Sequence, residues 1–461
     1  MAQLVLASQS ATDLSNPGFS RERLLNLYIR SFPSGAKSPA LIKRTAGLTA
    51  WLDLGTGAQV RELLHVPGDG LLYAVSDGKL YSTPETPAAT QRGSGINDNH
   101  NTTMAANQNG EVAIAAGGTY YTWDKTTFAT PTMNALTGVQ QVAGDGNYIF
   151  LADTSSGRIQ STAIGDVNTL AALDFANADE QPDRIRAIAW NGAYLYVLGT
   201  TTVETWRETG GNNFPYSREQ GTTIMKGIAA ARSIATEGNS IFYISQDWTV
   251  QEIRDGRRYE VSTPALSRIL QEYTDFSTVT GCTFAEGAHK FYQIRFSDRA
   301  SWSYDQKTTF WHERCSSQTD DLIPSKIVSS AQAFGLQLIG GDDGIIYKVD
   351  ETAIKEGADT LLRLIRTPPI VTDGDEVTLD RVGIDVKTGG TDIGRDASID
   401  LCISEDGETW SPPMTRNMGG FANRTRRVEW HGLGQADEHH LEFRITDPID
   451  VSFYGGRIDI S

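Results

Sequence analysis

The sequence contains several groups of oxygen and nitrogen ligands that could in principle bind a metal ion. Residues 342–344 (DDG) and 373–376 (DGDE) cluster carboxylates, and His439 is followed directly by His440. Neither acidic stretch has the ligand spacing of a calcium loop. Adjacent histidines in a strand point to opposite faces, which is poorly suited to chelation. We therefore predict turns at the acidic stretches, a solvent-exposed strand edge at the histidines, and no metal site.

Glycoside hydrolysis would need a pair of carboxylates placed on either side of the scissile bond. Acidic residues are plentiful, but the sequence context singles out no such pair. Residues 404–410 (SEDGETW) are similar to the Asp-box turn of sialidase-type propeller blades, although the stretch occurs once and is one residue shorter than the usual box. In sialidases this turn is structural. We therefore predict a hairpin turn with Trp410 buried, and no catalytic residue.

Phosphate binding would need a glycine-rich loop that ends in Gly-Lys-Ser or Gly-Lys-Thr, or a basic surface. No such loop occurs, and the formal net charge is −17 with a pI of about 4.9. Proteins that grip DNA phosphates are usually basic. We therefore expect a surface past which DNA slides, since like charges repel, with an excess of acid that simply keeps the protein soluble as the alternative. Two basic clusters are predicted to be solvated and ion-paired, with contact to DNA phosphates or to an acidic neighbouring subunit as the alternative: Arg254, Arg257 and Arg258, and Arg424, Arg426 and Arg427.

The composition indicates a folded, water-soluble chain without a disulfide framework. The three cysteines, Cys282, Cys315 and Cys402, are an odd and sparse set. No stretch approaches the roughly 20 apolar residues of a membrane helix, and the N-terminus lacks the features of a signal peptide. We expect synthesis in a reducing bacterial cytoplasm, no membrane insertion and no cofactor.

A repeated pattern along residues 56–362 identifies the elements that would have to position any site. Each copy has an apolar strand, a glycine-containing turn, a second hydrophobic strand, another turn and a third strand. Turns such as Asp77-Gly78 and Asn109-Gly110 favour tight antiparallel hairpins. Copies of this length, about 36 to 49 residues, suit one four-stranded propeller blade each. Seven copies are counted, with six or eight blades also possible because residues 1–55 could supply a strand that closes the ring.

Two segments depart from this repeat. Residues 263–273 carry apolar residues at helical spacing after Thr263-Pro264, which predicts a short helix between blades. Residues 366–369 (RTPP) indicate a linker, and long alternating strands follow it. We therefore predict an all-β protein in which residues 1–55 join or close the propeller, 56–362 form its blades, and 363–461 form a β-sandwich-like domain.

Short segments along the chain resemble the packaged-DNA stabilisation proteins of short-tailed phages, which are also described as tail hub or nozzle proteins. Each fragment is short, but together they cover nearly the whole chain in the order of that family. One departure is Tyr28-Ile29-Arg30, where the family often has Tyr-Pro-Glu. The matching segments are 26–28, 35–41, 45–48, 173–178, Pro182-Asp183, 203–206, Gly210, 214–216, 311–314, 366–368, 404–411, 446–448 and Gly455-Gly456.

The resemblance implies a structural virion protein with no catalytic residue, no cofactor and no metal. It implies a β-propeller in a homo-hexameric ring below the portal and its adaptor, with a needle or plug below and fibres or spikes at the sides. In that role the protein would retain packaged DNA and later conduct it, without sequence-specific binding. The rim segments 82–101 and 207–226 are our candidates for assembly contacts.

Two other function classes fit a propeller and stay open from the sequence. One is a carbohydrate-binding or sialidase-like propeller, and the other is a generic protein-interaction propeller. A carbohydrate-binding propeller would need exposed aromatic rings, and the recurrent aromatic residues include Trp123, Trp206 and Trp311. We expect them to pack between blades and not to form sugar platforms.

Overall fold

A computed structural model describes residues 2–7, 22–31, 40–98, 102–133, 136–177, 183–211, 213–319, 323–371, 376–388, 390–391, 393–420 and 425–461. Segments 35–39, 372–375 and 421–424, together with Pro182, therefore lie outside the described residues. The described part consists of strands and turns, with one α-helix and one short 3-10 turn. This confirms the predicted all-β class.

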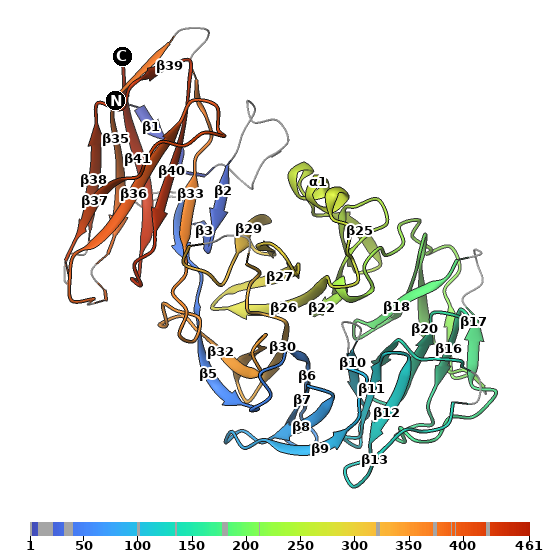
Figure 1. Cartoon of the computed structure of the whole chain (residues 1–461). Helices are drawn as coiled ribbons and strands as arrows, with labels where there is room; N and C mark the ends of the chain where they lie inside the picture. Colours follow the sequence, from blue (N-terminus) through green and yellow to red (C-terminus); the bar gives the residue numbers. More distant parts are fainter. Residues whose placement is uncertain are drawn as a thin grey trace.

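Most strands belong to four-stranded antiparallel sheets arranged as a ring (Figure 1). Each such sheet is one blade of the propeller. Within the described residues, six of them share no strand with any other sheet. Their strands are β6 (Val60–Val66), β7 (Leu71–Ser76), β8 (Lys79–Thr83) and β9 (Thr90–Ser94); β10 (Thr103–Ala106), β11 (Val112–Ala116), β12 (Thr119–Trp123) and β13 (Phe128–Ala129); β14 (Gln141–Gly144), β15 (Ile149–Asp153), β16 (Arg158–Ser161) and β17 (Phe175–Asn177); β18 (Ile185–Trp190), β19 (Leu195–Gly199), β20 (Val203–Glu208) and β21 (Tyr216–Arg218); β22 (Ala235–Glu237), β23 (Ser240–Ile244), β24 (Val250–Arg254) and β25 (Arg257–Glu260); and β30 (Ser329–Ala333), β31 (Leu336–Gly340), β32 (Ile345–Asp350) and β5 (Gly47–Asp53).

The last of these blades joins two distant parts of the sequence. Its outer strand, β5, comes from the N-terminal segment and runs antiparallel to β32, with Leu52 opposite Ile346 and Leu48 opposite Val349. The first strands of successive sheets lie side by side, and β30 returns to pack on β6. The ring is therefore closed by one strand from early in the chain and three from late in it.

The seventh copy of the repeat has a different setting. Its strands are β26 (Thr280–Glu286), β27 (His289–Arg295), β28 (Ser301–Asp305) and β29 (Phe310–Arg314). They are not a separate sheet, because β29 continues through β2 (Arg23–Leu25) and β33 (Arg363–Arg366) to β40 (Glu438–Ile445), β36 (Ala397–Ser404) and β37 (Met414–Gly419). Six independent blades are thus present, a number that the sequence left open, and the seventh copy connects the propeller to the C-terminal domain.

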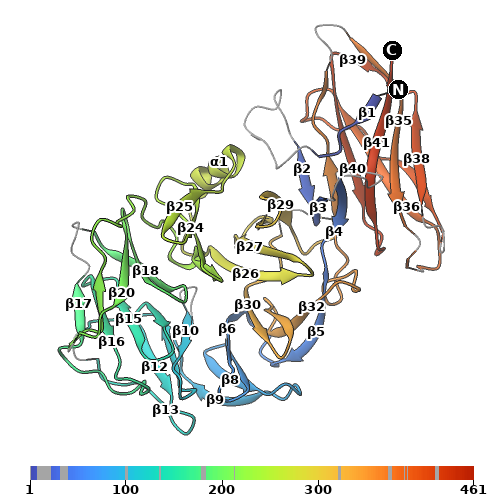
Figure 2. The same cartoon turned by 180° about the vertical axis from the view of Figure 1, so that it is seen from behind.

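A second sheet packs against the C-terminal end of this ten-stranded sheet (Figure 2). The hydrophobic core between them includes Trp430 and Phe443. This confirms the predicted β-sandwich. The second sheet contains β3 (Leu27–Ser31), β4 (Ala40–Arg44), β41 (Ser452–Ile460), β35 (Val377–Lys387) and β38 (Arg426–His431); β1 (Ala2–Leu4) pairs with β41, β39 (Gln435–Ala436) pairs with β35, and β34 (Ile370–Val371) pairs with β40 of the first sheet.

The segment predicted as a linker is part of the sheet that joins the two domains. Arg366 ends β33, which pairs with β2 on one side and β40 on the other. Thr367 is buried, and its N–H donates to the carbonyl of Leu441 at 2.9 Å. The passage from propeller to sandwich is therefore a hydrogen-bonded strand and not a free tether. The division of the chain at residues 55 and 362 stays a prediction.

Turn chemistry explains why the repeat folds as hairpins. Asp77 and Gly78 have φ of 52° and 65°, and Asp255 and Gly256 have φ of 51° and 72°. Positive φ at both central residues is typical of the type I′ turn, whose twist matches that of paired strands. The Asp-Gly pairs in the sequence therefore mark real hairpins.

The predicted inter-blade helix is present as α1 (Pro264–Glu272) between β25 and β26. The Thr263 hydroxyl accepts from the N–H of Leu266, as an N-cap does, and Pro264 occupies the first turn. Leu266 and Leu270 are buried against the neighbouring blades. In the described part of the chain, no helix is long and apolar enough to cross a membrane.

Asp183 fixes the β19–β20 hairpin of its blade. Its carboxylate accepts the N–H groups of Thr200 at 2.7 Å and of Thr201 and Thr202 at 2.8 Å. Burial alone would raise the pKa of this carboxyl, but the hydrogen bonds outweigh it and lower the pKa to about 2. The fold therefore stabilises the ionised form of Asp183.

We expect Asp183→Asn to lower the melting temperature at pH 7, with a difference from the wild type that shrinks on acidification. The folded pKa lies below the unfolded value of about 3.9. The contribution of Asp183 is therefore present above pH 4 and lost as pH falls through about 2. Thermal unfolding at pH 7 and near pH 2 measures this, with the exposed Asp437→Asn as control. A pH-independent difference would contradict the assignment.

Candidate functional site

Asp342 and Asp343, in the stretch predicted to form a turn, form ion pairs with basic side chains. The Lys326 ammonium lies 3.7 Å from Asp342 and 3.0 Å from Asp343, and Arg295 lies 3.2 Å from Asp342. Asp343 also accepts from the Tyr347 hydroxyl at 2.7 Å. Among the described residues there is no group of His, Cys, Asp and Glu side chains that could hold a metal ion.

The prediction of a solvent-exposed edge at the two histidines is wrong. His439 and His440 are 1% and 0% exposed, because β40 is an inner strand that pairs with both β33 and β36. His439 Nε2 lies 2.8 Å from the carbonyl oxygen of Val377, and His440 Nε2 lies 2.8 Å from the carboxylate of Glu438. The two rings therefore have different partners and do not form a chelating pair.

The stretch 404–410 forms a closed turn. Asp406 Oδ1 accepts the N–H groups of Glu408 and Thr409 at 2.7 Å each, and the Ser404 hydroxyl donates to it at 2.9 Å. These bonds, led by that from Thr409, lower the pKa of Asp406. The carboxylate is thus used in shaping the turn. Trp410 is only half-buried, which corrects the prediction that it is buried.

The two basic clusters differ in their environments. Arg254, Arg257 and Arg258 are exposed at the β24–β25 hairpin, and Arg258 donates to Gln251 at 2.9 Å. In the second cluster, Arg427 pairs with Asp385 at 2.8 Å on the surface of the sandwich. Arg424 lies outside the described residues, as does part of the rim segment 82–101. The role of both rim segments stays a prediction.

The recurrent tryptophans pack between blades. Trp123, Trp206 and Trp311 are 7%, 5% and 1% exposed, and each belongs to a hydrophobic cluster shared by neighbouring sheets. This accords with the expectation that they pack inside the propeller.

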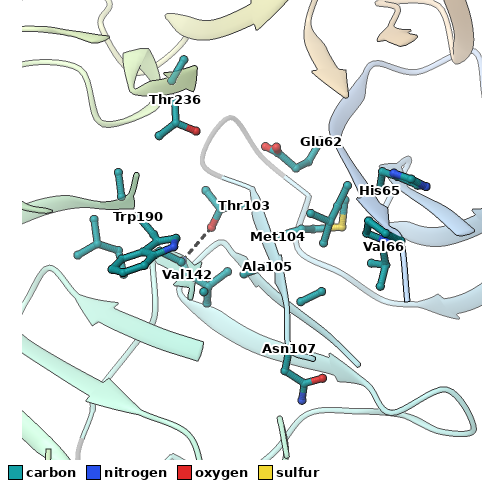
Figure 3. Close-up of a pocket in the computed structure, with 18 of the residues that line it drawn as sticks. Glu62, His65, Val66, Thr103, Met104, Ala105, Asn107, Val142, Trp190 and Thr236 are labelled. Atoms are coloured by element: carbon teal, nitrogen blue, oxygen red, sulfur yellow. Dashed lines mark hydrogen bonds between the residues drawn. The ribbon is translucent and has the colours of Figure 1, made fainter. Parts of the chain in front are cut away.

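The centre of the propeller contains a cavity of about 480 Å³ (Figure 3). Its walls come from the first strands of five blades, β6, β10, β14, β18 and β22. Its lining includes the small side chains of Ala105 and Ala143 and the larger ones of Met104 and Trp190; Met104, Ala105 and Trp190 are labelled in Figure 3. The Thr103 hydroxyl accepts the N–H of Val142 at 3.0 Å and ties two of the strands together.

An ion pair lies beside this cavity. Arg232 Nη2 lies 2.6 Å from Glu62 Oε2, and it joins the 3-10 turn Ala231–Ser233, which precedes β22, to β6. Burial raises the pKa of Glu62, and the neighbouring Arg232 opposes that rise. Gln141 adds a second cross-link by donating to the carbonyl of Ala231 and accepting the N–H of Ile188, each at 3.0 Å. The cavity has the volume of a small-molecule site.

The junction between the propeller and the sandwich holds a group of deeply buried charges. Arg314 and Glu286 pair at 2.8 Å with side chains that are 2% and 0% exposed. Arg314 Nε also donates to His312 Nε2 at 3.3 Å. Burial lowers the pKa of His312 well below its usual range, and Arg314 lowers it further, so this histidine is the neutral acceptor. Sequence reasoning missed this group; its one signal was the matching segment 311–314.

Further ion pairs connect the strands that meet at the junction. Arg23 pairs with Glu313 across β2 and β29, and Arg366 donates to Glu442 at 2.9 Å across β33 and β40. Asn26, directly after β2, is buried and bonds to both Cys315 and Leu362. The junction is therefore held by backbone pairing, ion pairs and a buried amide together.

Comparison with known protein families gives two adjoining matches. Residues 6–353 match the family model described as bacteriophage P22 Gp10, beta-propeller, and residues 363–461 match bacteriophage P22 Gp10, beta-sandwich. The two matches follow the order of the two domains in the structure. A search of curated protein sequences finds no match.

Several solved structures are similar to part of the chain at low sequence identity. Virginiamycin B lyase from Staphylococcus aureus is 11% identical with a TM-score of 0.44, covering 66% of this chain and 98% of the lyase chain. The Pan2 WD40 domain of Neurospora crassa is 9% identical with a TM-score of 0.41, covering 68% of this chain and 97% of that domain. With TM-scores this low, we draw no conclusion about function from either.

Proposed function

Because this chain belongs to the bacteriophage P22 Gp10 family, we propose that it forms the nozzle below the portal and adaptor, where it retains packaged DNA and later conducts it. Membership of this family makes the chain a structural protein of a phage tail. The observation that carries the proposal is the pair of matches, which together span both domains in order.

The strands around the propeller axis are cross-linked, because Glu62 pairs with Arg232 and the Thr103 hydroxyl ties β10 to β14. We infer that DNA passes through a channel enclosed by several subunits and not through a single propeller. We propose a homo-hexamer, with the adaptor above, a needle or plug below, and fibres or spikes at the sides.

The charge of the chain suits a conduit that does not grip DNA. A formal charge of −17 per subunit, repeated around a ring, repels phosphates if the acidic side chains face the lumen. A basic lumen in a charge map of the assembled ring would contradict this part of the proposal.

We also propose that the protein is not an enzyme. Asp406 is engaged in its own turn, and Asp342 and Asp343 are engaged with Lys326 and Arg295. Each of these carboxylates therefore has a structural role within the fold. Synthesis in the host cytoplasm and incorporation into the virion tail complete the proposal.

Particles assembled without this protein test the function directly. We expect heads that package DNA and then lose it, with tails that end below the adaptor in electron micrographs. DNA content per head is the quantity to score, and particles complemented with the wild-type chain are the control. Full heads with complete tubes and failed cell attachment would contradict the nozzle role and place the protein at the periphery of the tail.

A further inference from the structure

We propose that a pocket beside Trp410 in the sandwich receives the arginine-bearing β24–β25 hairpin of a second copy of this chain. The inference rests on the proposed ring and deepens it by naming two complementary surfaces. Both surfaces consist of described residues.

The β24–β25 hairpin projects from its blade. All seven residues from Arg254 to Glu260 are exposed, and β25 is the outer strand of its sheet, with one edge unpaired in the described structure. An exposed strand edge is a ready site for contact with another chain. The type I′ turn at Asp255-Gly256 gives this hairpin a defined shape without help from neighbouring elements.

The arginines of the hairpin are not equally free to reach a partner. Arg254 lies over the Tyr259 ring at 4.8 Å and within 3.8 Å of Glu252, and Arg258 donates to Gln251. The Arg257 side chain makes no hydrogen bond or ion pair with any described residue. Arg257 therefore presents an uncompensated cation next to the tip of the hairpin, on a chain that is otherwise strongly acidic.

The pocket in the sandwich is suited to a cationic side chain. It has a volume of about 620 Å³ and combines the carboxylates of Glu405 and Asp406 with the Trp410 ring, and Pro412 and Met414 add apolar wall. Carboxylates offer a guanidinium charge-assisted hydrogen bonds, and an indole face attracts it through the ring quadrupole. The apolar wall can cover the aliphatic stem of the same side chain.

The chain itself shows that the Trp410 ring accepts a guanidinium. Arg366 lies over this ring at 4.6 Å and is fixed by donating to the buried carboxylate of Glu442 at 2.9 Å. Trp410 also lines the pocket. The carbonyl of Met414, another lining residue, accepts the Trp430 indole N–H at 2.7 Å, and this bond fixes that part of the lining.

The two surfaces belong to different ends of the molecule. β25 lies on the propeller and β36 and β37 lie in the sandwich, apart from one another in both views (Figures 1 and 2). A hairpin cannot fill the pocket of its own chain in this arrangement. A contact between two different surfaces is head-to-tail, and such contacts build a closed ring when the rotation between subunits closes.

Reversing the charge of one residue on each surface, first singly and then together, tests the contact. Sedimentation velocity over a range of protein concentrations at low and physiological salt would give the apparent dissociation constant for self-association. We expect Arg257→Glu and Glu405→Lys each to raise it at least tenfold, and the two changes together in one chain to restore it to within about threefold, since opposite charges again face one another. Lys307→Glu, the same kind of change on an exposed residue outside both surfaces, is expected to leave it unaltered.

Three results would overturn the contact: single variants that associate like the wild type, no rescue in the double variant, or a wild-type chain that stays monomeric throughout. Thermal unfolding of each variant checks that the exposed substitutions leave the fold intact. DNA retention in particles is measured separately. If particles need this protein to keep their DNA but the charge changes have no effect on self-association, the nozzle role is supported and only this contact is contradicted.

Discussion

Replacing Glu286 with glutamine is expected to lower the free energy of unfolding by about 3 to 5 kcal/mol, the usual effect of removing one partner of a buried ion pair. Arg314 would keep its charge in a site where its side chain is only 2% exposed. The Phe284 and Phe291 rings lie 5.0 and 5.3 Å from its guanidinium carbon and exclude water from it. Urea unfolding at pH 7 measures the loss.

Two comparisons separate the buried pair from charge effects in general. Asp385→Asn removes a carboxylate from an exposed pair with Arg427, and such pairs contribute at most about 1 kcal/mol. Combining Glu286→Gln with Arg314→Met removes the buried charge as well, so we expect it to recover part of the loss. A Glu286→Gln variant no less stable than Asp385→Asn would show that the buried pair does not hold the junction.

Replacing Asn26 with alanine is expected to cost about 3 kcal/mol or more, because several buried polar groups lose their partners at once. The Asn26 amide donates to the carbonyls of Cys315 and Leu362 at 2.9 and 2.8 Å and accepts the N–H of Cys315 at 3.1 Å. No water can replace it readily, since Asn26 is 0% exposed. Limited proteolysis would detect a loosened junction alongside the loss measured by urea unfolding.

Glycine at the same position separates two contributions. Asn26 has φ of 54°, a left-handed conformation that asparagine tolerates better than alanine and glycine adopts freely. We expect Asn26→Gly to be more stable than Asn26→Ala by about 1 kcal/mol while still lacking the amide bonds. A glycine variant as stable as the wild type would mean that the backbone conformation, and not the amide, is what matters.

The blades could be predicted from sequence because each is a local structure. Asp77-Gly78 and similar pairs mark hairpins directly, and the alternation in residues 377–387 identifies a half-buried strand of the sandwich. Trp311 and the other blade tryptophans also follow from local pattern. These features involve residues that are near one another in the chain.

The junction could not be predicted in the same way, because its partners are far apart in sequence. β2 has only three residues, Arg23–Leu25, too few to show any periodicity, yet it pairs with both β29 and β33. The burial of His439 and His440 depends on β33 and β36 lying on either side of β40. Polar residues in a strand predict an exposed edge until the neighbours of that strand are known.

The pairing of strands from opposite ends of the chain affects when the protein can fold. β1 pairs with β41, β2 with β33, and β5 with β32, so the N-terminal strands wait for partners that are synthesised much later. Contacts of such long sequence separation slow folding, and unpaired strand edges expose a chain to aggregation. During translation the early blades can form as hairpins, but the ring cannot close until β30, β31 and β32 have been made, and the sandwich cannot close until β40 and β41 leave the ribosome. A polypeptide cut short within the sandwich would therefore carry an open junction, and the cell's quality control could remove it before it entered a growing tail.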